Sequence, residues 1–286
     1  MNDPYSLNDG PGALLPGKVA VITGAGGAIG AASARLFAKH GAHVVVSDID
    51  EGLAKAAVDQ IRAEGGKAEV DVTDVTDDAQ ILALRDRVLA AHGRCDVLVN
   101  NAGHWVRTVP DFVSGDAIFW DELYRINLHH IFTATHAFLP SMIARQAGSI
   151  INVSSIEGLR GYPQDPVYAA FKAAAVQFTK SLGVQVGNSG VRVNGIGPDV
   201  TDALQVPYDK LVPPEQEKLW PQWVPVGRMG VGLDQARVVL FLASDLSAFV
   251  TGHTIPTDGG TAAAGGWFRS NSRGQGRTWT NRPVAP

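Results

Sequence analysis

The segment TGAGGAIG, residues 23–30, decides how this chain folds. It follows a short β-branched run, KVAVIT (18–23), and opens an alanine-rich segment. Glycines in such a turn let the backbone bend tightly and approach a pyrophosphate, whose charge the helix N-terminus stabilises through its free N–H groups and its dipole. A plain strand-to-helix turn contains similar glycines, so both interpretations stay open on this segment alone. The residues we assign to a dinucleotide cradle here are Gly24, Gly26, Gly27, Ile29 and Gly30.

A carboxylate follows the second β-rich run. Asp48 comes directly after AHVVVS (42–47) and 18 residues beyond Gly30, close to the separation of about 20 residues at which an acidic side chain binds a ribose 2′-hydroxyl. Helix N-capping is the other role open to Asp48. A carboxylate at this point repels a 2′-phosphate, and the glycine turn has no Lys or Arg to bind one. We therefore expect the cofactor to be NAD and not NADP.

The rest of the chain alternates short apolar runs with longer helical patterns. The apolar runs lack strict alternation, which favours a parallel sheet covered on both faces. The sequence therefore predicts a single-domain α/β fold, a doubly wound, Rossmann-like parallel sheet of about seven strands with helices on both faces. Strands are expected at 18–23, 42–47, 67–72, 96–100, 149–154, 191–196 and 253–257, and helices at 29–40, 51–64, 77–92, 116–145, 166–187 and 232–243.

Three segments interrupt this rhythm. Residues 1–16 are rich in Pro, Gly, Asn and Asp and predict a loose N-terminal arm before a domain at 17–264. The proline-rich interval 198–228 is long for a connection and predicts a substrate lid. The polar, glycine-rich stretch 265–286 predicts an irregular C-terminal extension, for which closing a neighbouring subunit's pocket is one hypothesis.

Composition excludes several classes of protein. The 286 residues are 45% hydrophobic and carry a net charge of −4, so no strong field favours nucleic acid or an anionic membrane. No apolar run approaches the roughly 20 residues needed to span a bilayer, and no signal peptide is evident. Cys95 is the only cysteine, and the histidines lack HExxH-type spacing, so we expect no metal site and no intrachain disulfide. A cytoplasmic location fits these features.

A second motif, YAAFK, occupies residues 168–172. Tyr168 and Lys172 stand at i and i+4, which places both side chains on one face of a helix. A nearby ammonium stabilises phenolate, so we expect Lys172 to lower the pKa of Tyr168 and make it a general acid/base for an alcohol proton. A Tyr-x-x-x-Lys pair also occurs by chance on ordinary helices. Ser155, which ends the run SIINVSS at the expected carboxyl edge of the sheet, is a candidate to polarise the substrate oxygen, with Ser154 as the neighbouring alternative.

Together these motifs resemble the short-chain dehydrogenase/reductase family over about residues 17–260. The family's TGxxxGxG motif reads here with Ala28 in place of the middle glycine, a change that Gly26 would accommodate. The resemblance implies that Asp74 and Val75, in the second of two overlapping DVTD strings, bind adenine. It also implies that the NNAG motif, with Asn101, Ala102 and Gly103, passes close to the cofactor.

The resemblance also completes the catalytic set. Ser155 precedes Tyr168 by 13 residues, the family's usual separation, and Asn127 stands where the family has an Asn that holds a proton-relaying water. A capping or solvent-facing role is the alternative for Asn127. The resemblance implies that Asn127, Ser155, Tyr168 and Lys172 form a tetrad, and that Lys172 also holds the nicotinamide ribose.

Two positions depart from the family pattern. After the sixth expected strand, GPDVTD has Asp199 where the family has Gly, so that carboxylate either alters the loop or touches substrate. Pro198, Val200 and Thr201 are the candidates for contacts with the nicotinamide amide. Phe171 is bulky where the family has a small residue, which indicates packing in the core or in a subunit interface.

The expected activity is interconversion of a secondary alcohol and a ketone. We place the substrate pocket between NNAGHWVR (100–107), 158–162 and the lid. Aromatic residues there indicate an apolar or cyclic substrate, although they equally fit simple packing of the lid, and His104 and Arg107 are candidates to meet a polar or anionic substituent. The resemblance implies a homodimer or homotetramer. Alternative functions are a non-catalytic NAD-binding sensor and an epimerase or dehydratase on the same fold. The aromatic residues in question are Trp105, Tyr162, Trp220 and Trp223.

Overall fold

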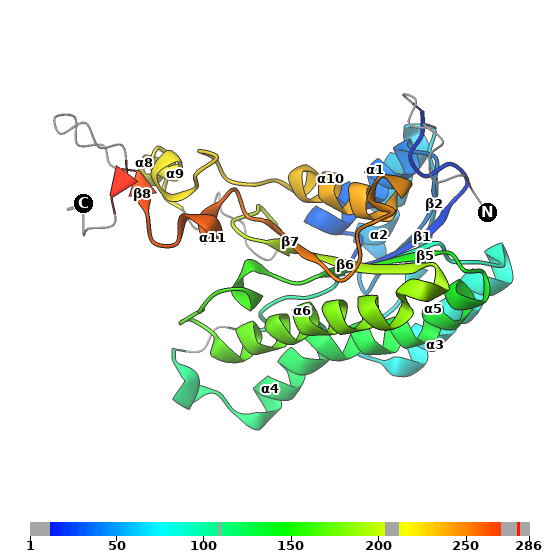
Figure 1. Ribbon diagram of the computed structural model, residues 1–286, viewed down its shortest axis with the longest axis horizontal. Helices are drawn as coiled ribbons and strands as arrows, with labels where there is room; N and C mark the ends of the chain where they lie inside the picture. Colours follow the sequence, from blue (N-terminus) through cyan, green and yellow to red (C-terminus); the bar gives the residue numbers. More distant parts are fainter. Residues whose placement is uncertain (1–11, 108–109, 204–211, 270–278, 281–286) are drawn as a thin grey trace.

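A seven-stranded, fully parallel sheet forms the centre of the molecule (Figure 1). The computed structural model describes residues 12–107, 110–203, 212–269 and 279–280. The strand order is β3-β2-β1-β4-β5-β6-β7, which confirms the doubly wound fold expected from the apolar runs. The strands are β1 (Val19–Thr23), β2 (His43–Asp48), β3 (Lys67–Val72), β4 (Val97–Asn100), β5 (Gly148–Val153), β6 (Val191–Pro198) and β7 (Thr254–Thr257).

Helices cover both faces of the sheet, and each face has its own apolar core. Because both faces are covered, the strands are buried on either side, and this explains why their sequences are apolar without alternation. One layer consists of α1 (Ala28–Lys39), α2 (Glu51–Ala63) and α10 (Gly232–Ala243); the other consists of α3 (Asp78–His92), α5 (His130–Ala144) and α6 (Pro166–Val186).

The strand order reverses at β1, which pairs with β2 on one side and with β4 on the other. In a parallel sheet, such a reversal opens a crevice at the carboxyl ends of the strands, where ligands bind. The glycine turn follows β1, the NNAG motif spans the end of β4, and Ser155 follows β5. The topology therefore brings all three motifs to the same edge of the sheet.

The prediction of one continuous helix at 116–145 is wrong, because the helix is interrupted. Two α-helices, α4 (Ala117–Tyr124) and α5, flank a π-helical turn at Arg125–His129. Asn127 lies in this turn, and its side-chain amide donates a hydrogen bond to the carbonyl of Leu123, 3.1 Å away. A side chain that bonds the backbone in this way competes with the regular helical ladder and favours a π turn.

Parts of the expected loose arm (1–16) and of the expected irregular extension (265–286) are ordered against the rest of the protein. Leu15, within the range expected to be loose, is fully buried in the core, and its N–H donates to the carbonyl of His40 at 2.9 Å. The apolar pair at 14–15 therefore anchors the chain just before β1, while residues 1–11 lie outside the described part. In the C-terminal extension, β8 (Phe268–Arg269) pairs antiparallel with β9 (Trp279–Thr280), and β8 lies beside α9 (Trp220–Trp223). The remaining 270–278 and 281–286 are outside the described residues.

Short helices complete the structure. In the expected lid, α8 (Pro214–Glu217) and α9 precede α10, and 204–211 lie outside the description. The other short elements are 3₁₀ turns at Phe112–Ser114, Ile156–Gly158, Gly187–Ser189 and Asp245–Ser247, and the helix α11 (Thr261–Ala264). Among the described helices, none has the length and apolar character that crossing a membrane requires.

Candidate active site

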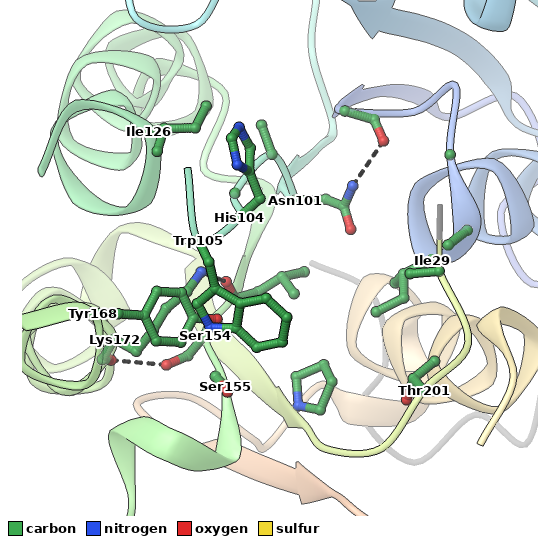
Figure 2. Close-up of a pocket in the computed structure, with 18 of the residues that line it drawn as sticks. Ile29, Asn101, His104, Trp105, Ile126, Ser154, Ser155, Tyr168, Lys172 and Thr201 are labelled. Atoms are coloured by element: carbon green, nitrogen blue, oxygen red, sulfur yellow. Dashed lines mark hydrogen bonds between the residues drawn. The ribbon is translucent and has the colours of Figure 1, made fainter. Parts of the chain in front are cut away.

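A cleft of about 910 Å³ opens at the carboxyl edge of the sheet (Figure 2). It brings together most of the residues assigned from the sequence. Of the assigned residues, Gly26, Gly30 and Asn127 do not line the cleft. The assigned residues on the wall are Gly24, Gly27, Ile29, Asp48, Asp74, Val75, Asn101, Ala102, Gly103, Ser155, Tyr168, Lys172, Pro198, Val200 and Thr201.

The glycine turn is shaped by close backbone approach. A Cβ atom on Gly30 would lie 2.3 Å from the carbonyl oxygen of Gly24, and one on Gly26 would lie 2.6 Å from the Cβ of Leu53. Ala28, not Gly26, takes the unusual backbone conformation, with φ of 25°. The expectation that Gly26 would absorb this substitution is therefore wrong. Gly26 is needed for space, and the strain falls on the alanine itself.

Asp48 lies at the end of β2, facing the glycine turn. Its Oδ2 accepts a hydrogen bond from the N–H of Gly26 at 2.8 Å, and its Oδ1 accepts one from the N–H of Asp50 at 3.0 Å. The N-cap of α2 is Asp50, whose carboxylate bonds the N–H of Leu53. The capping alternative for Asp48 is thus wrong, and its carboxylate is held in the cleft with lone pairs to spare.

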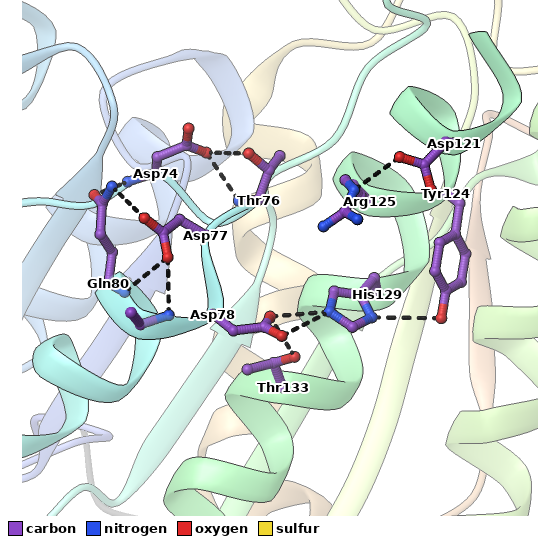
Figure 3. A network of polar contacts seen from close by, with 11 residues as sticks. Asp74, Thr76, Asp77, Asp78, Gln80, Asp121, Tyr124, Arg125, His129 and Thr133 are labelled. Atoms are coloured by element: carbon purple, nitrogen blue, oxygen red, sulfur yellow. Dashed lines mark hydrogen bonds and ion pairs between the residues drawn. The ribbon is translucent and has the colours of Figure 1, made fainter. Parts of the chain in front are cut away.

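The two DVTD strings place their first aspartates differently, and Figure 3 shows the surroundings of Asp74. Asp74 lines the cleft, and its carboxylate accepts hydrogen bonds from the N–H and hydroxyl of Thr76 at 2.8 and 2.7 Å. Asp71, in β3, instead forms a bidentate ion pair with Arg87 of α3. Val75, next to Asp74, is buried but reaches the cleft wall. The geometry therefore places Asp74 and Val75, and not Asp71, where a ligand can contact them.

The NNAG motif is fixed against the glycine turn. The side-chain amide of Asn101 donates to the carbonyls of Thr23 and Gly24, both at 2.9 Å. The hydroxyl of Thr23 accepts from the N–H groups of Asn101 and Ala102 at 3.1 and 3.2 Å. These bonds tie the ends of β1 and β4 into one rigid floor.

Tyr168 is positioned by the start of α6. Asp165 is the N-cap, and its carboxylate accepts hydrogen bonds from the N–H groups of Val167 and Tyr168 at 3.1 and 3.0 Å. Pro166 occupies the first turn, where its missing N–H costs nothing. Four residues later on the same face, Lys172 is almost fully buried, with Nζ 5.5 Å from the centre of the Tyr168 ring.

The two serines after β5 have different partners. The hydroxyl of Ser154 donates to the carbonyl of Lys172 at 2.8 Å and serves the backbone of α6. The side chain of Ser155 interacts with that of Tyr168 and favours its ionised form, and both residues line the cleft. The geometry therefore favours Ser155 over Ser154 as the residue that meets a substrate oxygen.

The acid–base properties of the tyrosine differ from the expectation. Burial raises the pKa of Tyr168 above its usual value, and the interaction with Ser155 only partly opposes this. Burial also lowers the pKa of Lys172 to about 8. The net pKa of Tyr168 is therefore raised rather than lowered, because burial outweighs the stabilisation of phenolate by nearby groups. The Lys172 ammonium donates to the carbonyl of Val153 at 3.3 Å.

Asn127 is fully buried, which excludes a solvent-facing role. Its amide nitrogen donates to the carbonyls of His104 and Leu123, while its Oδ1 has no protein partner among the described residues. A Cβ on Gly103 would lie 3.1 Å from this oxygen and 3.0 Å from Nζ of Lys172. The amide oxygen and the ammonium therefore border the same small space, which a glycine keeps open.

Contacts from α3 hold the π turn that carries Asn127 (Figure 3). The carboxylate of Asp78, in the first turn of α3, pairs with Nε2 of His129 at 2.9 Å and accepts from the hydroxyl of Thr133 at 3.0 Å. His129 also lies 3.4 Å from the hydroxyl of Tyr124. These bonds are positioning contacts that the sequence patterns did not reveal.

His130, directly after the π turn, is a second buried feature that sequence reasoning missed. It is fully buried, and burial, with the nearby charge of Lys172, lowers its pKa from 6.5 to about 3. The unfolded chain therefore binds a proton between these two pH values that the folded protein does not bind. The stability that depends on neutral His130 is therefore fully present above pH 6.5 and is lost as the pH falls towards 3.

We expect His130 to contribute a loss of about 2 kcal/mol in the free energy of unfolding between pH 7 and pH 5. Urea unfolding at both pH values measures it. A His130→Asn variant should lack this component, because Asn does not titrate, whereas an exposed control, His136→Gln, should keep it. An equal pH dependence in wild type and His130→Asn would contradict the assignment.

The outer half of the cleft is aromatic. The rings of Trp105 and Tyr162 lie 5.8 and 6.2 Å from the ring of Tyr168, and Trp220 and Trp223 also line the wall. His104 lines the cleft as expected. Arg107 does not: its guanidinium pairs with Asp116 at 3.3 Å and lies over the ring of Phe119. The expectation that Arg107 meets the substrate is therefore wrong.

Asp199 joins a charged cluster on the cleft wall. The guanidinium of Arg160 makes two contacts with the carboxylate of Glu157, at 2.7 and 3.1 Å, and a third with Asp199 at 3.1 Å. Thr261 donates a hydrogen bond to the same Asp199 oxygen. All three charged residues line the cleft, and two carboxylates around one guanidinium leave a net negative charge there. Arg160 and Glu157 had no motif to identify them.

Phe171 has a packing role within the chain. Its ring lies 5.7 Å from the ring of Tyr124, and the side chain contacts the two small apolar clusters that join α4, the π turn and α6. Of the two roles expected for Phe171, packing within the protein explains its size. The ring packs α6, which carries Tyr168, against α4, which precedes Asn127.

Known proteins share this arrangement. A family model described as Enoyl-(Acyl carrier protein) reductase matches residues 24–262. The chain is 37% identical to 3-oxoacyl-(acyl-carrier-protein) reductase FabG of Thermotoga maritima, over 86% of this chain and 98% of that protein. It is also 37% identical to 2,5-dichloro-2,5-cyclohexadiene-1,4-diol dehydrogenase LinX of Sphingobium indicum, over 86% and 96%.

Solved structures agree with the sequence relatives. A short-chain dehydrogenase/reductase from Burkholderia xenovorans superposes with a TM-score of 0.80 at 36% identity, over 88% of this chain and 98% of that one. An NAD(P)-dependent gluconate 5-dehydrogenase from Beutenbergia cavernae, with bound NADP at low occupancy, gives 0.80 at 32%, over 87% and 98%. The chain belongs to the short-chain dehydrogenase/reductase family and is an oxidoreductase of that family.

Proposed function

We propose that this protein is an NAD-dependent oxidoreductase that interconverts a neutral, cyclic secondary alcohol and its ketone. The observation that carries the proposal is the grouping of the Ser155 and Tyr168 hydroxyls with buried Lys172, in the same cleft as the Asp48 carboxylate. A proton-transfer group and a dinucleotide cradle in one cleft support a hydride-transfer enzyme.

The residues present fit a nicotinamide dinucleotide. Gly24 and Gly30 let the glycine turn pack closer to its neighbours than any Cβ would allow, and Gly103 keeps open the space beside Lys172 and Asn127. This tight turn at the start of α1 can receive a pyrophosphate. Asp48 would bind the adenosine ribose, Asp74 and Val75 the adenine, and Val200 and Thr201, with Pro198, the nicotinamide amide. The bound nicotinamide supplies a hydride acceptor and a positive charge.

The chain's own residues handle the proton. Ser155 orients the substrate oxygen, and Tyr168 takes the hydroxyl proton as hydride leaves the carbinol carbon, or returns it in the reverse direction. Because burial raises the pKa of Tyr168, phenolate needs every nearby positive charge, and Lys172 provides one. The oxygen of Asn127 and the ammonium of Lys172 border the space beside Gly103, where a water would link them to solvent.

Cofactor choice gives a direct test. We expect kcat/KM with NAD to exceed that with NADP by about 100-fold, because Asp48 repels a 2′-phosphate. An Asp48→Asn variant should lose most of this preference, because it removes the charge while its amide oxygen can still accept the Gly26 N–H. An Asp50→Ser variant keeps an N-cap and should retain the preference. Equal use of both cofactors by wild type would contradict the assignment.

Two features support a neutral ring as the substrate. Trp105 and Tyr162 offer flat apolar surfaces next to Tyr168, and such surfaces pack well against rings. The guanidinium of Arg160 is already paired with Glu157 and Asp199, so the wall repels rather than attracts an anion. The relative LinX is named for a neutral cyclic diol, which agrees with this choice.

A panel of alcohols with NAD tests the proposal by following NADH absorbance. We expect cyclohexanol and cyclohexanediols to be oxidised with kcat/KM at least about tenfold above 4-hydroxycyclohexanecarboxylate, a difference of roughly 1.4 kcal/mol that one unfavourable charge contact can supply. An Asp199→Asn variant should reduce this difference in kcat/KM, because it lowers the negative charge on the cleft wall. Preference for the carboxylate in wild type would contradict the neutral-ring proposal.

A second candidate is the reductase activity that FabG's name describes. Reduction of a 3-oxoacyl thioester by NADPH, with no oxidation of cyclic alcohols by NAD, would favour it.

An epimerase or dehydratase would recycle its cofactor and form no net NADH. A non-catalytic sensor would bind NAD without turnover. The homodimer or homotetramer expected from the family remains part of the proposal, and light scattering measures it.

A further inference from the structure

Two histidines and a glutamate meet at the end of the sheet opposite the cleft. His43 is the first residue of β2, Glu69 lies in the edge strand β3, and His92 ends α3. Their ligand atoms all lie within 4.8 Å of one another. Asp48, at the other end of β2, marks the cleft, roughly 16 Å away along the strand. The cluster is therefore separate from the proposed catalytic chemistry.

The fold brings these side chains to one face. His43 and Glu69 lie on neighbouring strands, where β2 and β3 pair with His43 opposite Lys67 and Val45 opposite Glu69. Residues two apart on a strand point to the same side, so His43 shares its face with Glu69. The end of α3 brings His92 to that face, with its ring centre 4.5 Å from that of His43.

The donor atoms converge on the two carboxylate oxygens. Nε2 of His92 is 2.7 Å from one oxygen of Glu69, and Nε2 of His43 is 3.7 Å from the other. Nε2 of His43 is buried and has no hydrogen-bond partner among the described residues. It is therefore a nitrogen removed from water that points towards a carboxylate too far away to bond it.

These separations match a tetrahedral metal site. Zn–N and Zn–O bonds of about 2.0–2.2 Å put neighbouring ligand atoms roughly 3.4 Å apart. The two imidazoles approach different oxygens of Glu69, at 2.7 and 3.7 Å, and one ligand atom from each residue lies within 4.8 Å of the others. Side-chain rotations that draw the three atoms together around an ion would reach that separation. Two imidazoles and one carboxylate form a donor set that suits Zn²⁺ and leaves a fourth position for water.

We propose that His43, Glu69 and His92 form a zinc site that clips the edge strand β3 and the end of α3 to β2. We assign it a structural role because it joins three elements at the end of the sheet opposite the cleft. It stabilises the half of the fold that contains Asp48 and Asp74. The proposal is independent of the proposed function and would stand for any reaction in the cleft.

Zinc binding to untagged protein, stripped with EDTA and then dialysed against Zn²⁺, tests the proposal. We expect one Zn²⁺ per chain by elemental analysis. Saturating Zn²⁺, at about 100 times its Kd, should raise Tm by roughly 5 °C or more. Co²⁺ in place of Zn²⁺ should give the visible absorption of a tetrahedral complex with nitrogen ligands.

Matched variants separate the site from general effects. His43→Gln and His92→Gln should each weaken Zn²⁺ binding by at least about tenfold, and each variant's own Zn²⁺-induced Tm shift corrects for any loss of basal stability. His136→Gln, at an exposed position on α5, should bind as wild type does. Lys67, exposed and opposite His43 in the ladder, places a like charge near the cation, so Lys67→Gln should tighten binding.

The proposal would be overturned if wild type bound no Zn²⁺. It would equally be overturned if His43→Gln and His92→Gln both kept the wild-type affinity and Tm shift, since any zinc would then bind elsewhere. Loss of alcohol oxidation in Tyr168→Phe with Zn²⁺ binding intact would show that the two sites fail separately.

Discussion

Replacing Tyr168 by Phe should reduce kcat/KM by about 1,000-fold while leaving cofactor affinity nearly unchanged. The change removes only the hydroxyl that Ser155 contacts, and general acid–base catalysis by one positioned group contributes about 10²–10⁴-fold. Steady-state kinetics with the best alcohol of the panel, together with NADH fluorescence titration, measure both quantities.

Tyr162→Phe is the matched control. Tyr162 lines the same cleft, but its hydroxyl is already engaged with the side chain of Gln164, to which it donates a hydrogen bond at 2.8 Å. We expect this variant to change KM and to keep most of kcat. Equal activity of Tyr168→Phe and wild type would contradict the catalytic assignment and revive the non-catalytic sensor.

Replacing Gly30 by Ala should weaken NAD binding by at least about 10-fold and destabilise the fold by about 1–3 kcal/mol. The added Cβ would lie 2.3 Å from the Gly24 carbonyl oxygen, 2.7 Å from the Asn101 side-chain nitrogen and 2.8 Å from the Cα of Ala25. Two of these atoms are backbone, and the Asn101 amide is held by two hydrogen bonds. The turn itself must therefore move.

Helix propensity sharpens this test. Gly30 lies within α1, where Ala is intrinsically favoured over Gly by about 1 kcal/mol, so any net loss of stability is smaller than the cost of the clash itself. Gly187→Ala is the control, since Gly187 has helical backbone angles and its Cβ would meet nothing within 4 Å. Urea unfolding and NADH titration compare the variants. A Gly30→Ala protein as stable as Gly187→Ala, with normal cofactor affinity, would show that the turn tolerates a methyl group.

Local patterns were most reliable where one element carries the signal. The strands were predictable because burial on both faces of a parallel sheet requires continuous apolar runs, and all seven are present. Tyr168 and Lys172 share a helix face because of helical periodicity. The break at Arg125–His129 was not predictable, because a π turn depends on which carbonyls the buried amide of Asn127 can reach.

Charge and burial were predictable only in part. Arg107 looked available to a substrate, but it is turned towards Asp116, nine residues further along the chain. The pKa of Tyr168 depends on how completely the surrounding elements exclude water, which five residues of sequence do not encode. The spacing to Tyr168 favoured Ser155 over Ser154, but the partner of Ser154, the carbonyl of Lys172 on another element, was visible only in the structure.

The sequence by itself determined the parallel α/β fold, the glycine cradle, the family and the spacing of the tyrosine and lysine, because each depends on a repeat or motif within one short segment. Only the tertiary structure decided that Asp199 pairs with Arg160, and that His43, Glu69 and His92 converge. These residues are far apart in sequence and share no periodicity. Their proximity follows from the strand order and from the layer of helices on each face, which arise only when the whole core packs.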